Sequence, residues 1–537
     1  MTKLLGIATS ALQFTQQALD TTSHNIANVN TQGYSRQRVE ATTREPSFQG
    51  FGFLGNGVKT AAVRRSYDQF LETQLRDSTA SFSELDALVR LSSQIDDLIA
   101  DPNTGLAASL ADFFNAVHDA ASDPTSIPAR QTLLSEARSL TDRFKGLDAR
   151  LSEMTHQVFQ DLGNLTHEVN AIAGKIAELN QRIIAAGRAS PNDLLDQRDQ
   201  LIAQLAEKVR VTQVQHANGA VSVFIGTGQA LVQDVRANAL LVKPNALNPE
   251  RPEIVLATPT GELTITRQIQ GGELKGSLRF VDEALMPTRA KLGRIAAGLA
   301  VEFNALHRSG FDLTGNTGQE FFTPFPIPIS QTGSGAIAVD YANVADLAAS
   351  DYRLDYDGSV YTLTRLSDGV TNTLTSFPTV IDGLNIDLTT PPSGPTSFLI
   401  RPTAVSSALE LALTDPRQIA LSATDTSGGA IGDNGIGLEL AALESKKLLL
   451  GGKATLHDAY SQMAAEVGTL THAAKIAHAA QDALKQQAIK AREAVSGVNL
   501  DEEAANLVKF QQSYQAAAYV VTIAQQTFEA LINAIRR

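Results

Sequence analysis

The residues that could carry chemistry are few in this 537-residue chain, and their spacing fits turns better than sites. GFGFLG at 50–55 has the G-x-G-x-x-G spacing of a dinucleotide-binding loop, but such a loop must lead into a helix, and NGVKTAAV continues as extended chain. DLTGNTGQE at 312–320 alternates oxygen-bearing residues, yet it lacks the glycine placement and ligand set of a calcium loop. We therefore expect a plain turn at each stretch, no cofactor and no metal.

The titratable residues also lack a recognisable catalytic grouping. The nine histidines are scattered without an H-E-x-x-H motif, and His472 and His478 are six residues apart on one expected helix. The acids at 501–503 fall in the first turn of a helix, where the dipole favours negative charge, and Asn499 has capping-box spacing to Glu502. With no nucleophile beside a base, we predict that the chain is not an enzyme.

Length, charge and cysteine content narrow the class of protein. A chain of this length predicts about three or four domains. The net charge of -13 argues against nucleic acid or anionic lipid as the main partner, and the lack of cysteine excludes disulfides and thiolate metal sites. No apolar run approaches the ~20 residues of a membrane span, so we expect a soluble chain. MTKLLGIATSAL weakly resembles a secretory signal, but its apolar register continues to Val29, which favours retention in the mature protein.

The elements that would position any functional surface are two long helices, one at each end of the chain. Each carries a narrow apolar stripe that steps by three and four residues. Helices this thin are unstable alone, so we predict that they pair as an antiparallel coiled coil and use the stripes as assembly contacts. Core helices of an ordinary bundle are the alternative, although the small stripe residues favour assembly. The stripes comprise Leu5, Ala8, Leu12, Thr15, Leu19, Thr22, Ile26 and Val29, and Leu507, Phe510, Tyr514, Ala517, Val521, Ala524, Phe528, Leu531 and Ile535.

Between these ends the pattern predicts a mainly α protein with β insertions, elongated and multi-domain. Helical periodicity dominates the body, and Asn218-Gly219 and Asp357-Gly358 mark hairpin turns within two β regions. The expected units are a terminal coiled coil (1–33 with 499–537), a helical body (34–210 with 273–320 and 436–498, including a small extended region at 34–67), a β region (211–272) and an outer β-rich domain (321–435).

The stretch SHNIANVNTQGYSRQ at 23–37 ends the first helix in polar residues. Asn28 and Asn30 tolerate left-handed backbone, and Gly33 permits a sharp exit. We expect this segment to turn the chain into the body while its amides bond to adjacent subunits. The expected interface residues here are Asn25, Ile26, Asn28, Val29, Gly33 and Tyr34.

HNIANVNTQGYSRQ at 24–37 resembles the A-N-x-N-T-x-G-Y signature of bacterial flagellar axial proteins, and GYSRQRV at 33–39 is similar to the hook-associated protein 1 family. Stretches at 193–209, 292–318, 397–403 and 497–535 resemble that family in the same order. The resemblance implies a structural protein that polymerises at the distal end of the hook and connects it to the filament. Another hook, distal-rod or filament subunit is the first alternative, and a flagellum-associated enzyme is the second.

The resemblance also implies partners and a location. The partners would be further copies of the chain in a ring, the hook protein, the next junction protein, and an export chaperone for the C-terminal helix. Nucleic acid and membrane are not expected partners. The chain would be made in the cytoplasm, exported by the flagellar type III channel without a cleaved signal, and incorporated in the extracellular flagellum.

Overall fold

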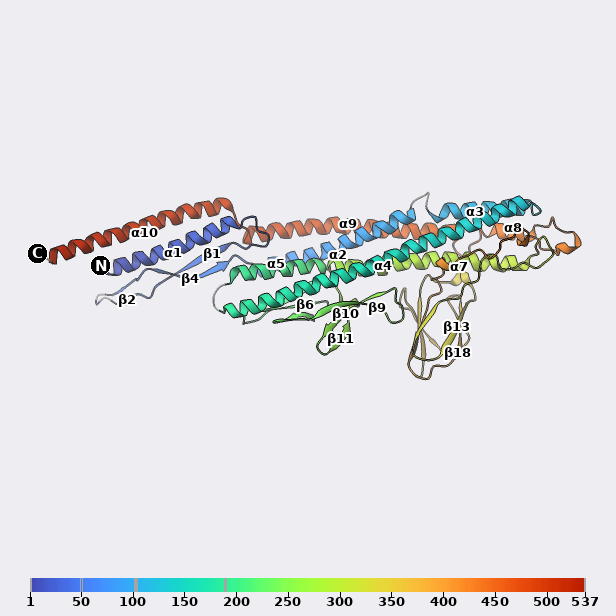
Figure 1. The fold of residues 1–537 in the computed structure, drawn as a ribbon, viewed down its shortest axis with the longest axis horizontal. Coiled ribbons are helices and arrows are strands. Elements are labelled where there is room, and N and C mark those ends of the chain that lie inside the picture. The colour runs from blue at the N-terminus through green and yellow to red at the C-terminus, as the bar shows by residue number, and fades with distance from the viewer. Residues whose placement is uncertain (1, 49, 51, 101–104, 188–190, 536–537) are drawn as a thin grey trace.

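The computed structural model describes residues 2–48, 50, 52–100, 105–187 and 191–535. The molecule is an elongated stack of long helices, and both ends of the chain lie at the same end of it (Figure 1). Two β regions lie along one side of the helical body (Figure 1). The predicted fold class, mainly α with β insertions and paired terminal helices, is confirmed.

The helices form where the sequence offers both periodicity and caps. Ser126 begins the longest helix by accepting a hydrogen bond from the Ala129 amide, and Thr455 and Asp458 form a capping box. The helices are α1 (Thr2–Ala27), α2 (Gln69–Ala100), α3 (Leu106–Ser122), α4 (Ile127–Ala186), α5 (Asn192–Lys208), α6 (Gly272–Arg279), α7 (Met286–Ser309), α8 (Gly435–Ala442), α9 (Leu456–Ser496) and α10 (Leu500–Ile535), with a π turn at Phe280–Leu285 before α7.

The body is built on one continuous apolar core shared by α2, α3, α4, α7 and α9. Within it the rings of four fully buried phenylalanines contact one another, with centroids between 4.6 and 6.3 Å apart: Phe113, Phe303, Phe321 and Phe322. Aromatic clusters of this kind add specific edge contacts to burial. The described residues of this core include none from α1 or α10.

The first β region packs against α4. Asn218-Gly219 makes the predicted hairpin between the first two strands, with Gly219 at a φ of 89°. Asn180 of α4 donates to the Val221 and Asp234 carbonyls and fixes the sheet to the helix. The strands are β5 (Val211–Gln215), β6 (Val221–Ile225), β7 (Gln229–Gln233), β8 (Arg236–Ala237), β9 (Ala239–Pro244), β10 (Pro252–Thr258) and β11 (Gly261–Thr264).

The outer β region has its own core and two sheets, with strand orders β12-β19-β14-β15-β16 and β13-β18-β17. Asp357-Gly358 makes the predicted turn between β14 and β15. Glu250 joins this region to the body because it pairs with both Arg289 of α7 and Arg401. The strands are β12 (Ile329–Thr332), β13 (Ala336–Tyr341), β14 (Tyr352–Tyr356), β15 (Tyr361–Arg365), β16 (Thr371–Leu374), β17 (Thr379–Ile381), β18 (Leu384–Thr390) and β19 (Thr396–Ile400).

A long β arm follows α1 and lies against it. Strands β1 (Gln37–Thr43) and β4 (Val58–Arg65) pair antiparallel, and β2 (Ser47–Phe48) and β3 (Phe53–Leu54) continue the ribbon to its tip. Within the GFGFLG stretch, Phe53 and Leu54 form strand β3, whereas Phe51 lies outside the described residues, so the expected turn falls partly outside them. In the DLTGNTGQE stretch, Asp312 closes a turn by accepting from the Thr314 and Asn316 amides.

Candidate assembly site at the terminal helices

Asn25 lies near the end of α1, and its amide is fully hydrogen-bonded inside the chain. Nδ2 donates to the Gln37 carbonyl (2.9 Å) and to Glu503 Oε2 (3.1 Å). Oδ1 accepts from the Tyr34 hydroxyl (2.8 Å) and the Gln37 amide (2.9 Å). An asparagine amide offers two donors and two lone pairs, and all four are used. Within the single chain, the Asn25 amide is therefore satisfied by internal partners, and its expected contact with an adjacent subunit stays a prediction.

Arg36 clamps the first turn of α10 to the start of the β arm. Its Nε donates to Glu503 Oε1 (2.6 Å) and its Nη1 donates to Glu502 Oε2 (2.6 Å). The side chains of Arg36 and Glu503 are only 9% and 2% exposed. The Arg36 amide also donates to the carbonyl of Ser496, the last residue of α9 (2.9 Å). A paired, hydrogen-bonded charge is the form in which a buried ion pair is tolerated, so this clamp sets the angle between α10 and the body.

The acids at 501–503 thus do more than complement the helix dipole. Asn499 caps α10 as predicted, because its Oδ1 accepts from the amides of Asp501 (2.9 Å) and Glu502 (3.3 Å). The Glu502 carboxylate, which a capping box would turn back onto Asn499, binds Arg36 instead. The predicted cap forms, and the reciprocal half of the capping box is replaced by the clamp.

A second charged cluster joins the β arm to α5. Asp196 accepts from the Ser35 amide (3.1 Å) and from Arg65 (2.6 Å), and Arg65 also binds Asp199 (2.9 Å). Burial raises the pKa of Asp196 above its usual value, although Arg65 opposes the shift. Burial, followed by the nearby carboxylates, also raises the pKa of the Tyr34 hydroxyl. These groups are held in fixed internal bonds, which suits them to positioning the arm.

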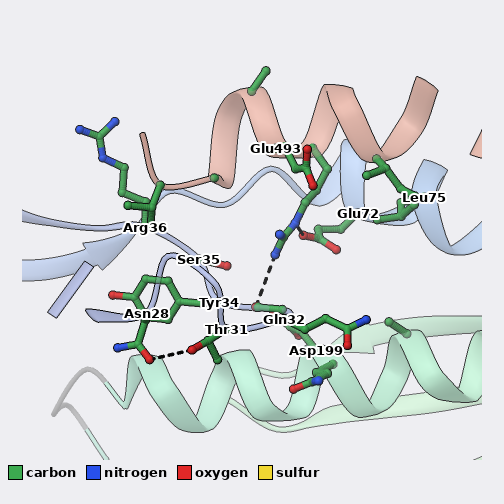
Figure 2. A pocket seen from close by; sticks show the side chains of 18 of the residues that line it. Asn28, Thr31, Gln32, Tyr34, Ser35, Arg36, Glu72, Leu75, Asp199 and Glu493 are labelled. Carbon is green, nitrogen blue, oxygen red and sulfur yellow. Dashed lines mark hydrogen bonds and ion pairs between the residues drawn. The ribbon is translucent and has the colours of Figure 1, made fainter. Parts of the chain in front are cut away.

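The loop from Asn28 to Gly33 crosses an open polar groove between α5 and α9 (Figure 2). The Thr31 hydroxyl donates to Asn28 Oδ1 (3.1 Å), and Asn28 Nδ2 donates to the His24 carbonyl (3.0 Å). Gly33 has a φ of 82°, and an added Cβ would lie 3.3 Å from the Gln200 side chain. The sharp exit predicted at Gly33 is present. Asn28 and Asn30, which the sequence suggested could adopt left-handed backbone, do not have a positive φ.

The buried face of α1 coincides with the predicted stripe at its small members Ala8, Thr15 and Thr22, and departs from it at the large ones. The most buried positions of the helix are Ala8, Ser10, Thr15, Ala18, Thr22 and Asn25. Leu12, Leu19 and Ile26 lie on the flank of this stripe and are half-buried, and Leu5 is exposed. The two helices therefore approach through small and polar residues, and the large side chains remain partly uncovered.

Comparison with known proteins agrees with this architecture along the whole chain. The model of the flagellar hook-associated protein FlgK helical domain matches residues 92–322, and the model of the hook-associated protein 1 D2-like domain matches 329–402. Models of the flagella basal body rod protein and of the rod FlgEFG C-terminal region match 5–34 and 492–534. Flagellar hook-associated protein 1 of Escherichia coli K12 is 34% identical over 550 residues, covering 99% of this chain and 100% of that protein.

The chain belongs to the flagellar hook-associated protein 1 family. The Salmonella typhimurium relative is likewise 34% identical over 558 residues, covering 99% of this chain and 100% of its own. The structure of the flagellar hook junction protein FlgK from Burkholderia pseudomallei matches with a TM-score of 0.73 at 23% identity, over 79% of this chain and 100% of that one. Family and fold together support a role at the junction of hook and filament.

In this family member, α10 leaves most of its apolar side chains exposed. Ala517 and Ala524 are buried against α1, and Leu507, Phe510 and Val521 are half-buried beside them. Tyr514 is 39% exposed, and Phe528 and Leu531 are each 50% exposed. The side chain of Ile535 lies outside the described residues. The predicted stripe therefore divides into a covered part of small residues and an uncovered part of large ones.

The structure brings together Asn25, Tyr34 and Gly33 at the base of the terminal pair, whereas the stripe residues extend away from it along the helices. Sequence reasoning missed Arg36 and the Glu502–Glu503 pair as partners, because 466 residues separate Arg36 from Glu502. The available signal was a single arginine directly after the GYS of the signature and two adjacent acids at a helix start. Within the described ranges, no group of three or more His, Cys, Asp or Glu residues is placed to hold a metal ion.

Proposed function

We propose that this chain is a structural subunit that polymerises at the distal end of the flagellar hook, connects hook to filament and permits filament assembly. The observation that carries the proposal is the α1–α10 pair, which extends from one end of the body and leaves its large apolar side chains half-buried or exposed. Large apolar side chains on its flanks are stabilised only if neighbouring subunits cover them. The predicted stripe residues and the Asn28–Gly33 loop are proposed assembly contacts on this basis.

We propose unit boundaries that separate the assembly helices from the helical body and the outer β regions. We assign 1–33 with 499–537 to assembly, 34–210 with 273–320 and 436–498 to a rigid helical support, and 211–272 and 321–435 to outer β units. The Arg36 clamp lies where the first two of these units meet, so it would transmit the orientation of the terminal pair to the body.

The partners proposed are further copies of the chain, the hook protein, the next junction protein and an export chaperone for the C-terminal helix. The exposed apolar face of α10 supports the chaperone, because such a helix needs cover before assembly. We also propose export to the extracellular flagellum without a cleaved signal. None of the described helices is long and apolar enough to cross a membrane.

We propose that the chain has no catalytic activity. Its most elaborate polar cluster, around Asn25 and Arg36, is occupied by internal hydrogen bonds and ion pairs, as described above. A hook, distal-rod or filament-type subunit is the second candidate. The observation that favours it is the pair of rod-protein models that match the two terminal regions. Those regions build the terminal pair, so both candidates share the same assembly element.

The test is to make the exposed end of α10 polar without disturbing the body. The double variant Phe528→Ser and Leu531→Ser should fold normally but bind isolated hook ends at least about tenfold more weakly, because two apolar contacts of about 1.5–3 kcal/mol each would be lost. Binding would be measured by sedimentation with purified hooks, and the fold by thermal unfolding.

The matched control is Gln525→Ser with Gln526→Ser, which changes two exposed polar residues one turn earlier. The control should bind hook ends like the unchanged chain. Normal binding by the Phe528 and Leu531 variant would show that the exposed stripe is not an assembly surface.

A further inference from the structure

The outer β region contacts α7 of the body closely along one side. Ala297 of α7 lies inside the core of the outer region, and a Cβ added to Gly293, one turn earlier, would overlap the Thr403 carbonyl. Beside the same helix, the Gly451 amide donates to the Ala345 carbonyl (2.7 Å). In Figure 1 the outer region, marked by β13 and β18, extends to one side from α7. Close contacts along one helix constrain position more than rotation, so this line can act as a pivot.

A second, ionic contact joins the two units through a single carboxylate. Glu250 lies in the loop between β9 and β10 of the first β region, which packs against the body. Its Oε2 accepts from Arg289 Nη1 of α7 (3.1 Å) and from Nη2 of Arg401, the residue that follows β19. The loop holds Glu250 in place, because the Glu250 amide donates to Oδ1 of the buried Asn248 (3.2 Å). Burial would raise the pKa of Glu250, but Arg289 and Arg401 outweigh it and lower the pKa. We call Glu250, Arg289 and Arg401 the Glu250 latch.

Each arginine of the latch has an alternative carboxylate within its own unit. Arg289 Nε lies 3.6 Å from Asp148 Oδ1, and both residues belong to body helices. Arg401 Nε lies 3.7 Å from Asp351 Oδ2, and both residues belong to the outer region. These separations are too long for hydrogen bonds, and neither buried Nε has a hydrogen-bond partner among the described residues. In each arginine, the unsatisfied donor is therefore the atom that the alternative carboxylate approaches.

The unsatisfied groups favour an exchange of partners, and the structure leaves room for it. A buried donor without an acceptor is unfavourable. Burial raises the pKa of Asp351, although Arg401 opposes the shift, so a closer cation would stabilise this carboxylate. Beside the latch, an open cavity of about 400 Å³ lies between Ala290 of α7 and Ala349 of the outer region. The side chains can therefore shift without displacing the core of either unit.

We propose that the Glu250 latch is a two-state switch that holds or releases the outer β region. In the latched state, Glu250 binds both arginines and joins the outer region to the body. In the released state, Arg289 binds Asp148 within the body. Arg401 then binds Asp351 within the outer region, which rotates about its contact with α7.

Partner exchange lowers the free energy of release, because neither buried arginine is left without a carboxylate. Glu250 has a side-chain exposure of 31% and is solvated once the arginines leave it. A neighbouring subunit that favours one orientation of the outer region would shift this equilibrium. The switch goes beyond the proposed function, since it acts within the isolated chain and its test does not involve hook binding.

Distances between two spin labels test the switch in the isolated full-length chain, which has no cysteine of its own. Labels on Gln157→Cys of α4 and Thr373→Cys of β16 report the distance between body and outer region, and both positions are exposed. Glu250→Gln keeps the size of the side chain but removes its charge. We expect the ratio of released to latched molecules to rise at least about tenfold, because each hydrogen bond to a charged group is worth about tenfold or more.

The matched control is Glu262→Gln, which removes an ion pair with Lys243 inside the first β region and should leave the distances unchanged. Thermal unfolding checks that each variant is folded. Glu250→Asp keeps the charge but shortens the side chain, so it should release the outer region less than Glu250→Gln, and it replaces that variant if the latter does not fold. Distances that are the same in the Glu250 variant and in the control would overturn the inference.

A second substitution separates partner exchange from an ordinary interface contact. Adding Asp351→Asn to Glu250→Gln should lower the ratio of released to latched molecules, because Arg401 then lacks a carboxylate in the released state. Adding Asp340→Asn instead, at an exposed acid of the same region, should leave the ratio as it is in Glu250→Gln. If Asp351 only stabilised the interface, its loss would release the outer region further. A ratio equal to or above that of Glu250→Gln would therefore overturn partner exchange.

Discussion

The molecule contains two long antiparallel helix pairs that differ in the size of the side chains they bury. The pair α2–α9 belongs to the body and buries large side chains, among them Leu88, Ile95 and Met463. In the pair α1–α10 the buried apolar residues are alanines, and the leucines and phenylalanines are half-buried or exposed. Hydrophobic stabilisation is about 0.8 kcal/mol per buried CH₂, so the body holds most of this stabilisation within the chain. The large apolar side chains of the terminal pair can gain the same kind of stabilisation only when neighbouring subunits bury them.

The substitution Ile95→Ala should have the largest effect on the stability of the isolated chain. Ile95 is fully buried in the body core, so its truncation should cost about 2–5 kcal/mol through lost burial and a residual cavity. Denaturant unfolding followed by circular dichroism measures this as a lower midpoint at an unchanged slope. Ile476→Ala, on the exposed part of α9, is the matched control and should be close to neutral. A loss below about 1 kcal/mol for Ile95→Ala would contradict a self-sufficient body.

Acid should weaken the body through His307, in the second largest effect. The His307 Nε2 accepts from the Ala420 amide (2.8 Å), and Nδ1 donates to the Gln319 carbonyl (2.6 Å). Burial lowers the pKa of His307 from 6.5 to about 4, although the Gln319 carbonyl opposes the shift. Because the folded-state pKa is depressed, this stabilisation is complete above pH 6.5 and is lost as the pH falls to about 4. The free energy of unfolding should fall by about 3 kcal/mol across that window.

The measurement is unfolding by denaturant at several values between pH 7 and pH 4. The variant His307→Gln should unfold with a shallower pH dependence, whatever its stability at pH 7, because the titrating group is absent. His472→Gln changes an exposed histidine and should leave the pH dependence unchanged. An identical pH dependence in His307→Gln and the unchanged chain would show that the acid sensitivity of the body arises elsewhere.

Local features were predictable from sequence because their causes are local. Asn218-Gly219 and Asp357-Gly358 turn where positive φ is needed, and Asn499 caps α10. The antiparallel terminal pairing followed from the two stripes. The predicted stripe includes the buried residues Ala8, Thr15 and Thr22, but periodicity alone could not tell that Ala18 is more deeply buried than Leu19. Close packing of the backbones favours the small residue, and the leucine is displaced to the flank.

The base of the terminal pair was the least predictable part of the site. Asn25 was predicted as a contact with another subunit, and no pattern in the sequence indicated the partners that it has within the chain, Tyr34, Gln37 and Glu503. The Arg36 clamp depends on a contact between the two ends of the chain, for which one sequence offers no pattern. The same limit applies to Asp196 and Arg65, whose meeting depends on how α5 packs on the β arm.

The smallest change in stability is expected for Leu12→Ala, and it sharpens the comparison most. Leu12 is half-buried on the flank of α1, so its truncation should cost the isolated chain below about 1 kcal/mol, and alanine's higher helix propensity offsets part of that. Binding to hook ends should nevertheless fall at least about tenfold, because a neighbour would otherwise complete the burial of this side chain. Unfolding midpoints and hook sedimentation on the same preparation separate the two effects. If Leu12→Ala instead destabilises the isolated chain as much as Ile95→Ala while hook binding is retained, the terminal pair is an ordinary internal core, and the two helix pairs differ only in the size of the residues they bury.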